Sequence, residues 1–378
     1  MQSSDLRDLN VAVVGAGYGG AAAAKALSLL GANVHIYEQA VRVREVGAGI
    51  GLRPPTLDLF RTWGIFEAMA AVSSPSDYFE ILTAAGEPIM REEWPGIHDY
   101  AQETKTRLIH RGDFIETFFK VLPPDAVHLG YRTQSVTDEG GRAVIAFANG
   151  ATVTADLVIG ADGIRSVVRQ QLFSDKGPVF SGEHAFRAVI PAGDVYGLPL
   201  DANLRMYIGE NGTKIYVLPL LHRNQVSYDI TALSSDDTWA PAVTRDDLVA
   251  MVGGFDERLV KITRDLDLST LSGRAVYDID PLETWHTDAV ALLGDAAHAM
   301  LHHQGQGANQ AIQDAGGLAD ALLAADSVKS ALALYQATRK PVTDNLQRVS
   351  RQSWDSGAVD TAFPGQKPAA TSPAGVTP

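Results

Sequence analysis

The feature that most restricts the fold of this chain is a glycine-rich segment, Gly15–Gly20, between an expected strand and an expected helix. The β-branched run Val11–Val14 precedes it, and the alanine- and leucine-rich stretch Ala21–Leu30 follows, with Gly31 placed to end a helix. A second apolar run, Val34–Tyr37, comes next. Strand, glycine turn, helix and strand in this order predict a parallel β-α-β unit.

The spacing of the glycines predicts a turn that binds a dinucleotide. Gly15 permits a tight turn, Gly17 lets a pyrophosphate approach the backbone, and Gly20 lets the helix pack against the strand. Glu38, at the end of the second strand, is placed to bind ribose hydroxyls. A plain turn without a ligand is the alternative, and the pattern by itself fits FAD and NAD equally.

Two later segments extend the expected parallel sheet. Leu157–Ile159 and Ala289–Leu293 are apolar runs, and each is followed by Gly and Asp, as expected where strand ends line a ligand crevice. Between them the pattern alternates, which predicts an inserted antiparallel sheet with hairpin turns. Its expected strands are Ala185–Ile190, Leu204–Ile208, Lys214–Leu218 and Gln225–Ile230, with further strands within Asp77–Asp99.

Composition narrows the function classes. The 378 residues suffice for two layered units, and the formal net charge of −14 disfavours nucleic acid and anionic membranes as partners. The absence of cysteine excludes disulfides and thiolate catalysis. The polar start, Met1–Leu9, is unlike a secretory signal, and no apolar run is long enough to cross a bilayer. We therefore expect a cytoplasmic protein.

Three motifs together resemble those of the single-component, FAD-dependent aromatic hydroxylases, the group of 4-hydroxybenzoate and salicylate hydroxylases. They are Gly15–Gly20 with Glu38, Gly160–Ser166, and Gly294–His298 with Gly305–Asn309. The resemblance covers about residues 9 to 354. Within the group the chain is most similar to the branch of 6-hydroxynicotinate 3-monooxygenase and salicylate 1-monooxygenase, through Gly15–Ala24, Glu38–Ala40, Gly47–Ile50, His110–Asp113 and Arg187–Ile190.

The resemblance implies an α/β fold with a Rossmann-like FAD-binding domain of the 4-hydroxybenzoate hydroxylase type. Segments 9–75, 105–178 and 270–330 are expected to form this domain. Segments 76–104 and 179–269 are expected to form an inserted antiparallel-sheet substrate domain. A C-terminal helix is expected over 331–354, and the composition of the tail, 364–378, predicts disorder.

The resemblance also implies which residues contact FAD. Asp295 would bind the ribityl chain, and Arg111 the phosphates or ribityl chain. Asp162 has two interpretations of equal weight, as a nucleotide contact and as a structural residue. Backbone N–H groups after Gly305 would face the flavin and stabilise its negative charge. The full set is Gly15, Gly17, Gly20, Glu38, Gln39, Arg111, Asp162, Asp295, Gly305, Gly307, Ala308 and Asn309.

The substrate is expected between the flavin and the antiparallel sheet. Side chains alternate along a strand, so Lys214, Tyr216 and Leu218 share a face. Tyr228 and Met206, on neighbouring strands, are expected to join them. An ordinary half-buried sheet with a solvated lysine is an equally weighted alternative.

Two adjacent histidines lie between the Asp295 motif and the flavin-facing glycines. The resemblance places His303 near the substrate, where an imidazole suits a general base for a phenol. It places the backbone at His302 beside the flavin, although relatives often have Pro there, and the His302 side chain is a candidate for substrate binding. We expect the two rings on opposite sides of an extended segment, and His298 in a structural role. Gly51 stands where the nicotinate-type relatives have His, so their substrate cannot be transferred directly.

These observations predict an FAD-dependent monooxygenase that hydroxylates a small aromatic or N-heteroaromatic substrate through a C4a-hydroperoxyflavin. NADH or NADPH is expected as a transient co-substrate with O2, since only one dinucleotide motif is present. No metal is needed, and a monomer or homodimer is expected. The alternatives are a flavoprotein that oxidises or epoxidises a non-aromatic or polycyclic substrate, and a catalytically silent flavin-binding protein.

Overall fold

The structure is a computed structural model that describes residues 6–42, 48–93 and 105–352. A five-stranded parallel sheet has the order β18-β12-β1-β2-β8. Because β1 lies between β2 and β12 and all three strands are parallel, the segments that follow β1, β2 and β12 lie together at one edge of the sheet. The strands are β1 (Asn10–Val14), β2 (Asn33–Glu38), β8 (Val127–Leu129), β12 (Leu157–Gly160) and β18 (Val290–Leu292).

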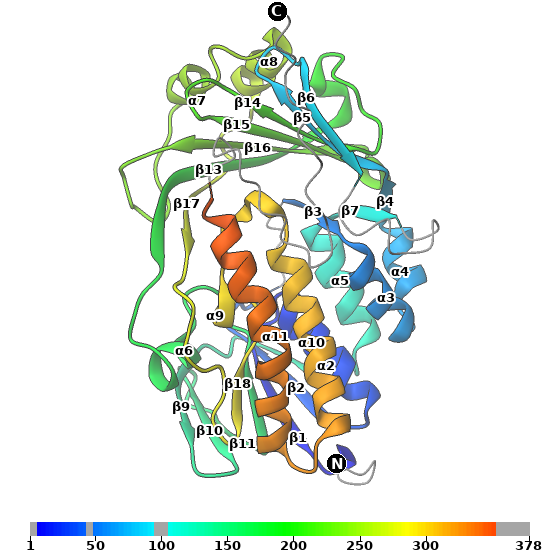
Figure 1. Ribbon diagram of the computed structural model, residues 1–378, viewed down its shortest axis with the longest axis vertical. Coiled ribbons are helices and arrows are strands. Elements are labelled where there is room, and N and C mark those ends of the chain that lie inside the picture. Colours follow the sequence, from blue (N-terminus) through cyan, green and yellow to red (C-terminus); the bar gives the residue numbers. More distant parts are fainter. Residues whose placement is uncertain (1–5, 43–47, 94–104, 353–378) are drawn as a thin grey trace, which may run out of the picture.

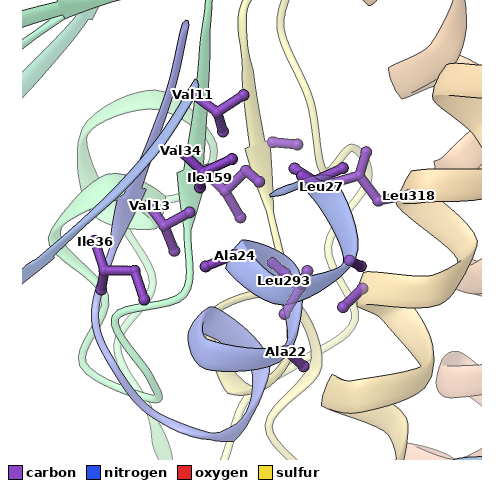
Figure 2. Packing of buried hydrophobic residues seen from close by; sticks show 14 of the residues in the cluster. Val11, Val13, Ala22, Ala24, Leu27, Val34, Ile36, Ile159, Leu293 and Leu318 are labelled. Atoms are coloured by element: carbon purple, nitrogen blue, oxygen red, sulfur yellow. The ribbon is translucent and has the colours of Figure 1, made fainter. Parts of the chain in front are cut away.

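Helices cover this sheet and enclose the larger core. The helix α2 (Tyr18–Leu29) packs between the strands and α10 (Gly307–Ala324), and α11 (Val328–Ser350) lies beside α10 (Figure 1). Figure 2 shows the contact: Val11, Val13 and Ile159 of the strands face Ala24 and Leu27 of α2, with Leu318 behind. The small alanines of α2 let the helix lie close to the sheet, which fixes the position of its N-terminus.

A seven-stranded sheet lies across one end of these helices, and α7 (Arg245–Met251) and α8 (Glu257–Asp265) cover its outer face (Figure 1). Its order is β17-β13-β16-β15-β14-β5-β6. All neighbours are antiparallel except β14 and β5. The strands are β5 (Tyr78–Thr83), β6 (Pro88–Glu93), β13 (Val179–Pro191), β14 (Leu204–Ile208), β15 (Lys214–Leu220), β16 (Gln225–Leu233) and β17 (Ser272–Asp278).

Smaller elements complete the described chain. Two three-stranded sheets comprise β3 (Gly49–Leu52), β7 (Thr106–His110) and β4 (Ser73–Ser76), and β9 (Thr133–Asp138), β10 (Ala143–Phe147) and β11 (Thr152–Ala155). The other helices are α3 (Pro54–Thr62), α4 (Phe66–Ala71), α5 (Arg111–Val121), α6 (Val167–Leu172) and α9 (Asp295–His298). Short 3₁₀ turns are η2 (Ala192–Val195), η3 (Leu221–Arg223) and η4 (His302–Gln304).

The expected fold class is confirmed: a parallel α/β unit carries a mostly antiparallel sheet. Five strands of this sheet, β13 to β17, lie between β12 and β18 in the chain, and β5 and β6 come from an earlier segment. The β17 strand extends that sheet beyond residue 269, where we expected the insertion to end. Residues 94–104, 353–354 and the tail 364–378 lie outside the described residues, as does Gly47. Within the described chain, no helix is both long and apolar enough to cross a membrane.

Candidate active site

The glycine turn after β1 leaves the N-terminus of α2 open to a ligand. Gly15 has φ +99°, and a Cβ there would lie 2.5 Å from the carbonyl oxygen of Ala161. A Cβ on Gly20 would lie 2.0 Å from the carbonyl oxygen of Gly15, so only glycine allows this approach of helix to turn. No atom lies within 4 Å of a Cβ built on Gly17, which precedes α2. This geometry fits a pyrophosphate on the first N–H groups of α2.

Glu38 ends β2 next to this turn. Its carboxylate accepts hydrogen bonds from the backbone N–H groups of Ala16, at 2.9 Å, and Ala40, at 2.8 Å. It therefore fixes the turn as well as presenting oxygen atoms at the sheet edge. Gln39 follows with an exposed side chain.

Asp295 lies exposed at the start of α9, three residues after the end of β18. A Cβ on Gly307, the first residue of α10, would lie 3.7 Å from Asp295 Oδ1, so the two expected flavin contacts converge. Asp314, buried in α10, binds residues on either side of Asp295 in the chain. Its Oδ2 accepts from Gly294 N at 3.0 Å and from His298 Nε2 at 2.5 Å, and its Oδ1 from Arg339 Nε at 2.8 Å. Sequence reasoning missed Asp314.

Asp162 makes structural contacts. Its carboxylate accepts from Ser166 Oγ at 2.5 Å and Val167 N at 2.7 Å, which holds the start of α6. Because Ala161 touches Gly15, Asp162 still lies beside the glycine turn. Of its two expected roles, the structural one is visible in these contacts.

The remaining expected cofactor residues form two groups. Arg111, exposed at the start of α5, places its guanidinium 5.4 Å from the ring centroid of Tyr18, at the first turn of α2. Gly305 adopts φ +60° and leads into Gly307 and Ala308 at the start of α10.

Asn309 is buried, and its side chain is fully hydrogen-bonded within the protein. Its Oδ1 accepts from Arg53 N and Thr56 Oγ1, both at 2.8 Å, and its Nδ2 donates to Gly51 O at 2.8 Å and Gly305 O at 3.2 Å. The side chain therefore joins α3 and β3 to α10, and only the backbone N–H groups at this helix start remain as expected donors to a flavin.

The inner face of the seven-stranded sheet carries polar side chains in register. One row runs across four neighbouring strands, in which each residue lies opposite the next: Arg187 of β13, Asp229 of β16, Tyr216 of β15 and Met206 of β14. The Tyr216 hydroxyl is buried and has no hydrogen-bond partner among the described residues, and burial raises its pKa, so the phenol keeps its proton at neutral pH. The structure thus brings Tyr216 and Met206 together as expected.

Tyr228 lies on the opposite face of the same sheet, contrary to expectation. It is paired with Val217, not with Tyr216. Its hydroxyl bonds to Leu259 O at 3.1 Å and Thr263 Oγ1 at 2.9 Å, beneath α8. The register of β15 and β16 causes this, because a shift of one residue moves a side chain to the other face.

The two histidines meet the inner sheet face. His302 Nε2 lies 3.1 Å from Thr231 Oγ1, and its ring packs 5.9 Å from that of Tyr216. His303 Nε2 lies 2.7 Å from Glu183 Oε2. The rings are 4.9 Å apart in a 3₁₀ turn, so the expectation of opposite sides of an extended segment was wrong.

Burial, with Arg187 and His303 nearby, lowers the pKa of His302 well below its usual value, so this ring is neutral at pH 7. Lys214 does not project freely: its Nζ pairs with Glu183 Oε1 at 2.7 Å. Sequence reasoning missed Glu183, which is 120 residues from His303 in the chain.

These features are those of a dinucleotide-binding protein: the glycine turn Gly15–Gly20, Glu38 at the end of β2, and the start of α10 at Gly307 beside Asp295. The chain belongs to the FAD binding domain family, whose model matches residues 8–350. The cradle at Gly17 and the convergence of Asp295 with Gly307 fit this cofactor. The protein is an FAD-dependent monooxygenase of the aromatic hydroxylase group.

Known proteins are similar along nearly the whole chain. The 6-hydroxynicotinate 3-monooxygenase of Pseudomonas fluorescens is 32% identical over 91% of this chain and 90% of its own length. The 3-amino-4-hydroxybenzoate 2-monooxygenase of Streptomyces cremeus is 31% identical, over 92% and 87%. The structure of a salicylate hydroxylase substrate complex is 27% identical and has a TM-score of 0.75, covering 91% of this chain and 87% of that one. Klebsiella pneumoniae HpxO with FAD and uric acid, at 22% identity, shares the fold with a TM-score of 0.81, over 91% and 87%.

Proposed function

We propose that this enzyme hydroxylates a small aromatic or N-heteroaromatic ring of the hydroxypyridine or hydroxybenzoate type, with NADH or NADPH and O2. The observation that carries the proposal is the position of Tyr216, His302 and His303 on the inner sheet face, joined to the segment that leads into Gly307. FAD, when bound, supplies hydride acceptance and the activation of O2.

The protein's own groups position and deprotonate the ring in this proposal. The Tyr216 hydroxyl, which has no hydrogen-bond partner in the described part of the chain, donates a hydrogen bond to an oxygen of the substrate, because a buried hydroxyl gains most from a polar ligand atom. His303 accepts the proton of the ring hydroxyl, which makes the ring more electron-rich. Met206 and the neutral His302 form apolar and weakly polar walls that exclude water.

The names of the relatives supply the probes. NADH and NADPH oxidation and O2 uptake by the FAD-loaded enzyme are measured with and without 6-hydroxynicotinate, 3-amino-4-hydroxybenzoate and salicylate. At least one compound is expected to stimulate both rates several-fold and to give a product heavier by one oxygen atom.

His303→Gln should retain FAD but lose most of this product, whereas Tyr228→Phe, on the outer sheet face, should keep it. An FAD-loaded enzyme that none of these or related aromatic compounds stimulates would overturn the proposal, in favour of a non-aromatic substrate or a silent flavin-binding protein.

A further inference from the structure

Three charged or titratable side chains from separate segments form one hydrogen-bonded chain on the inner sheet face. Lys214 of β15 donates to Glu183 Oε1 of β13 at 2.7 Å, and Glu183 Oε2 lies 2.7 Å from His303 Nε2 of η4. The side chains are only 14%, 7% and 10% exposed, in that order. Little solvent is therefore available to replace either contact.

Glu183 is ionised in this arrangement. Burial opposes its ionisation, but the contacts with His303 and Lys214 outweigh burial and lower the pKa of Glu183 to about 2. An ionised carboxylate only accepts hydrogen bonds. His303 Nε2 must therefore carry the proton in this contact, which leaves Nδ1 of a neutral ring as the nitrogen with a lone pair.

We propose that Glu183 is a positioning residue that fixes His303 in the Nε2–H tautomer, so that Nδ1 is the atom that accepts the proton of the substrate hydroxyl. Lys214 contributes by donating a hydrogen bond to the other carboxylate oxygen of Glu183, Oε1. This inference rests on the proposed hydroxylation for the role of Nδ1, but the tautomer can be tested without a substrate. Carboxylate–imidazole pairs orient the ring and select its tautomer in this general way.

The variant Glu183→Gln gives a specific prediction because Lys214 has only donors. The amide oxygen of Gln must face Lys214, so the amide NH2 group faces His303. His303 Nε2 must then accept a hydrogen bond, and the ring changes to the Nδ1–H tautomer. The nearly identical size of Glu and Gln leaves the packing of the sheet unchanged.

Removing the lysine should reverse the effect. In Lys214→Met, Glu183 still only accepts, so the Nε2–H tautomer remains. In the double variant, Glu183→Gln with Lys214→Met, the amide can turn its oxygen to His303 and restore the Nε2–H tautomer. A merely structural role of Glu183 would not produce this pattern of loss and restoration.

The tautomer is measured by NMR of the FAD-loaded enzyme with 15N-labelled histidine, because protonated and unprotonated ring nitrogens differ clearly in chemical shift. His303→Gln identifies the resonance. The matched control is Glu80→Gln: Glu80 is also buried and ion-paired, with Arg205, but lies in the row of the sheet that includes Tyr228, on the outer face. The Glu80→Gln variant should leave the His303 tautomer and the turnover unchanged.

Turnover with the stimulating compound should fall about 100-fold in Glu183→Gln, the lower end of general base catalysis, and recover in the double variant. A wild-type His303 with Nδ1–H, or a Glu183→Gln enzyme that keeps Nε2–H, would overturn the inference whatever the substrate. Tautomers that follow the prediction in an enzyme that no aromatic compound stimulates would support the Glu183 contact and overturn the hydroxylation instead.

Discussion

Gly20 and Gly15 are in such close contact that a Cβ on Gly20 would lie 2.0 Å from the carbonyl oxygen of Gly15. Gly17, between them in the chain, has open space around the same position. Gly20 therefore has a structural role, because a methyl group there would meet the protein backbone. Gly17 has a ligand-binding role in this account, because a methyl group there would enter the expected pyrophosphate site.

Gly17→Ala and Gly20→Ala should therefore fail in different ways. Gly20→Ala overpacks the turn and should lower the free energy of unfolding by about 2 kcal/mol or more. Gly17 has φ −72°, which alanine adopts easily, so Gly17→Ala should cost at most about 1 kcal/mol. FAD affinity of Gly17→Ala should nevertheless fall more than about tenfold, since a 1.4 kcal/mol loss at the pyrophosphate suffices. Denaturant unfolding without FAD and fluorescence titration with FAD measure the two effects, and equal stability losses would contradict the assignment.

Asp314 should stabilise the fold through its buried contacts to His298 and Arg339. Asp314→Asn leaves Arg339 with an uncompensated buried charge and should cost about 3–5 kcal/mol in denaturant unfolding. The exposed pair of Lys329 with Asp288 provides a control, because Asp288→Asn should cost less than about 1 kcal/mol.

The pH dependence of this loss follows from the pKa of Asp314. Burial opposes its ionisation, but His298 and Arg339 outweigh it and lower the pKa to about 2. A depressed carboxyl pKa stabilises the folded state above the unfolded pKa, near 3.8, and this contribution disappears as the pH falls toward 2. The stability difference between wild type and Asp314→Asn should therefore be constant above about pH 5 and shrink below pH 4. A difference that grows in acid would refute this account.

Tyr216 and Tyr228 lie on opposite faces of one sheet and should respond oppositely to loss of the hydroxyl. Tyr216→Phe removes a buried group without a described partner, so the free energy of unfolding should stay the same or rise slightly. Tyr228→Phe loses hydrogen bonds to Leu259 and Thr263 and should cost about 0.5–1.5 kcal/mol. Substrate affinity should fall about tenfold only in Tyr216→Phe. If Tyr228→Phe weakened substrate binding instead, the assignment of the inner face would be wrong.

The sequence predicted the parallel sheet and its glycine turn because local patterns determine them. Val11–Val14 and the glycines that follow are adjacent in the chain, and the structure places them in β1 and the turn before α2. Among the strands of the larger sheet, β14 was predicted at its observed bounds, Leu204–Ile208, and β15 and β16 to within three residues, whereas β13 begins at Val179, well before the predicted Ala185.

The inner sheet face was predicted only in part, because it depends on register and on contacts distant in the chain. Tyr228 was assigned to the wrong face since alternation within a strand does not fix the pairing between β15 and β16. Glu183 carried no local motif, and only the fold brings it to His303. The same holds for Asp314, whose partners His298 and Arg339 lie 16 and 25 residues away.

The central claim is that the bound flavin and the inner sheet face hold an aromatic ring for transfer of one oxygen atom from O2. The most direct test supplies the FAD-loaded enzyme with NADH or NADPH, the stimulating aromatic compound and 18O2, and weighs the product by mass spectrometry. The account predicts one 18O atom in each product molecule and none from labelled water. Stimulated oxidation of NADH or NADPH with no 18O in the aromatic compound would contradict it.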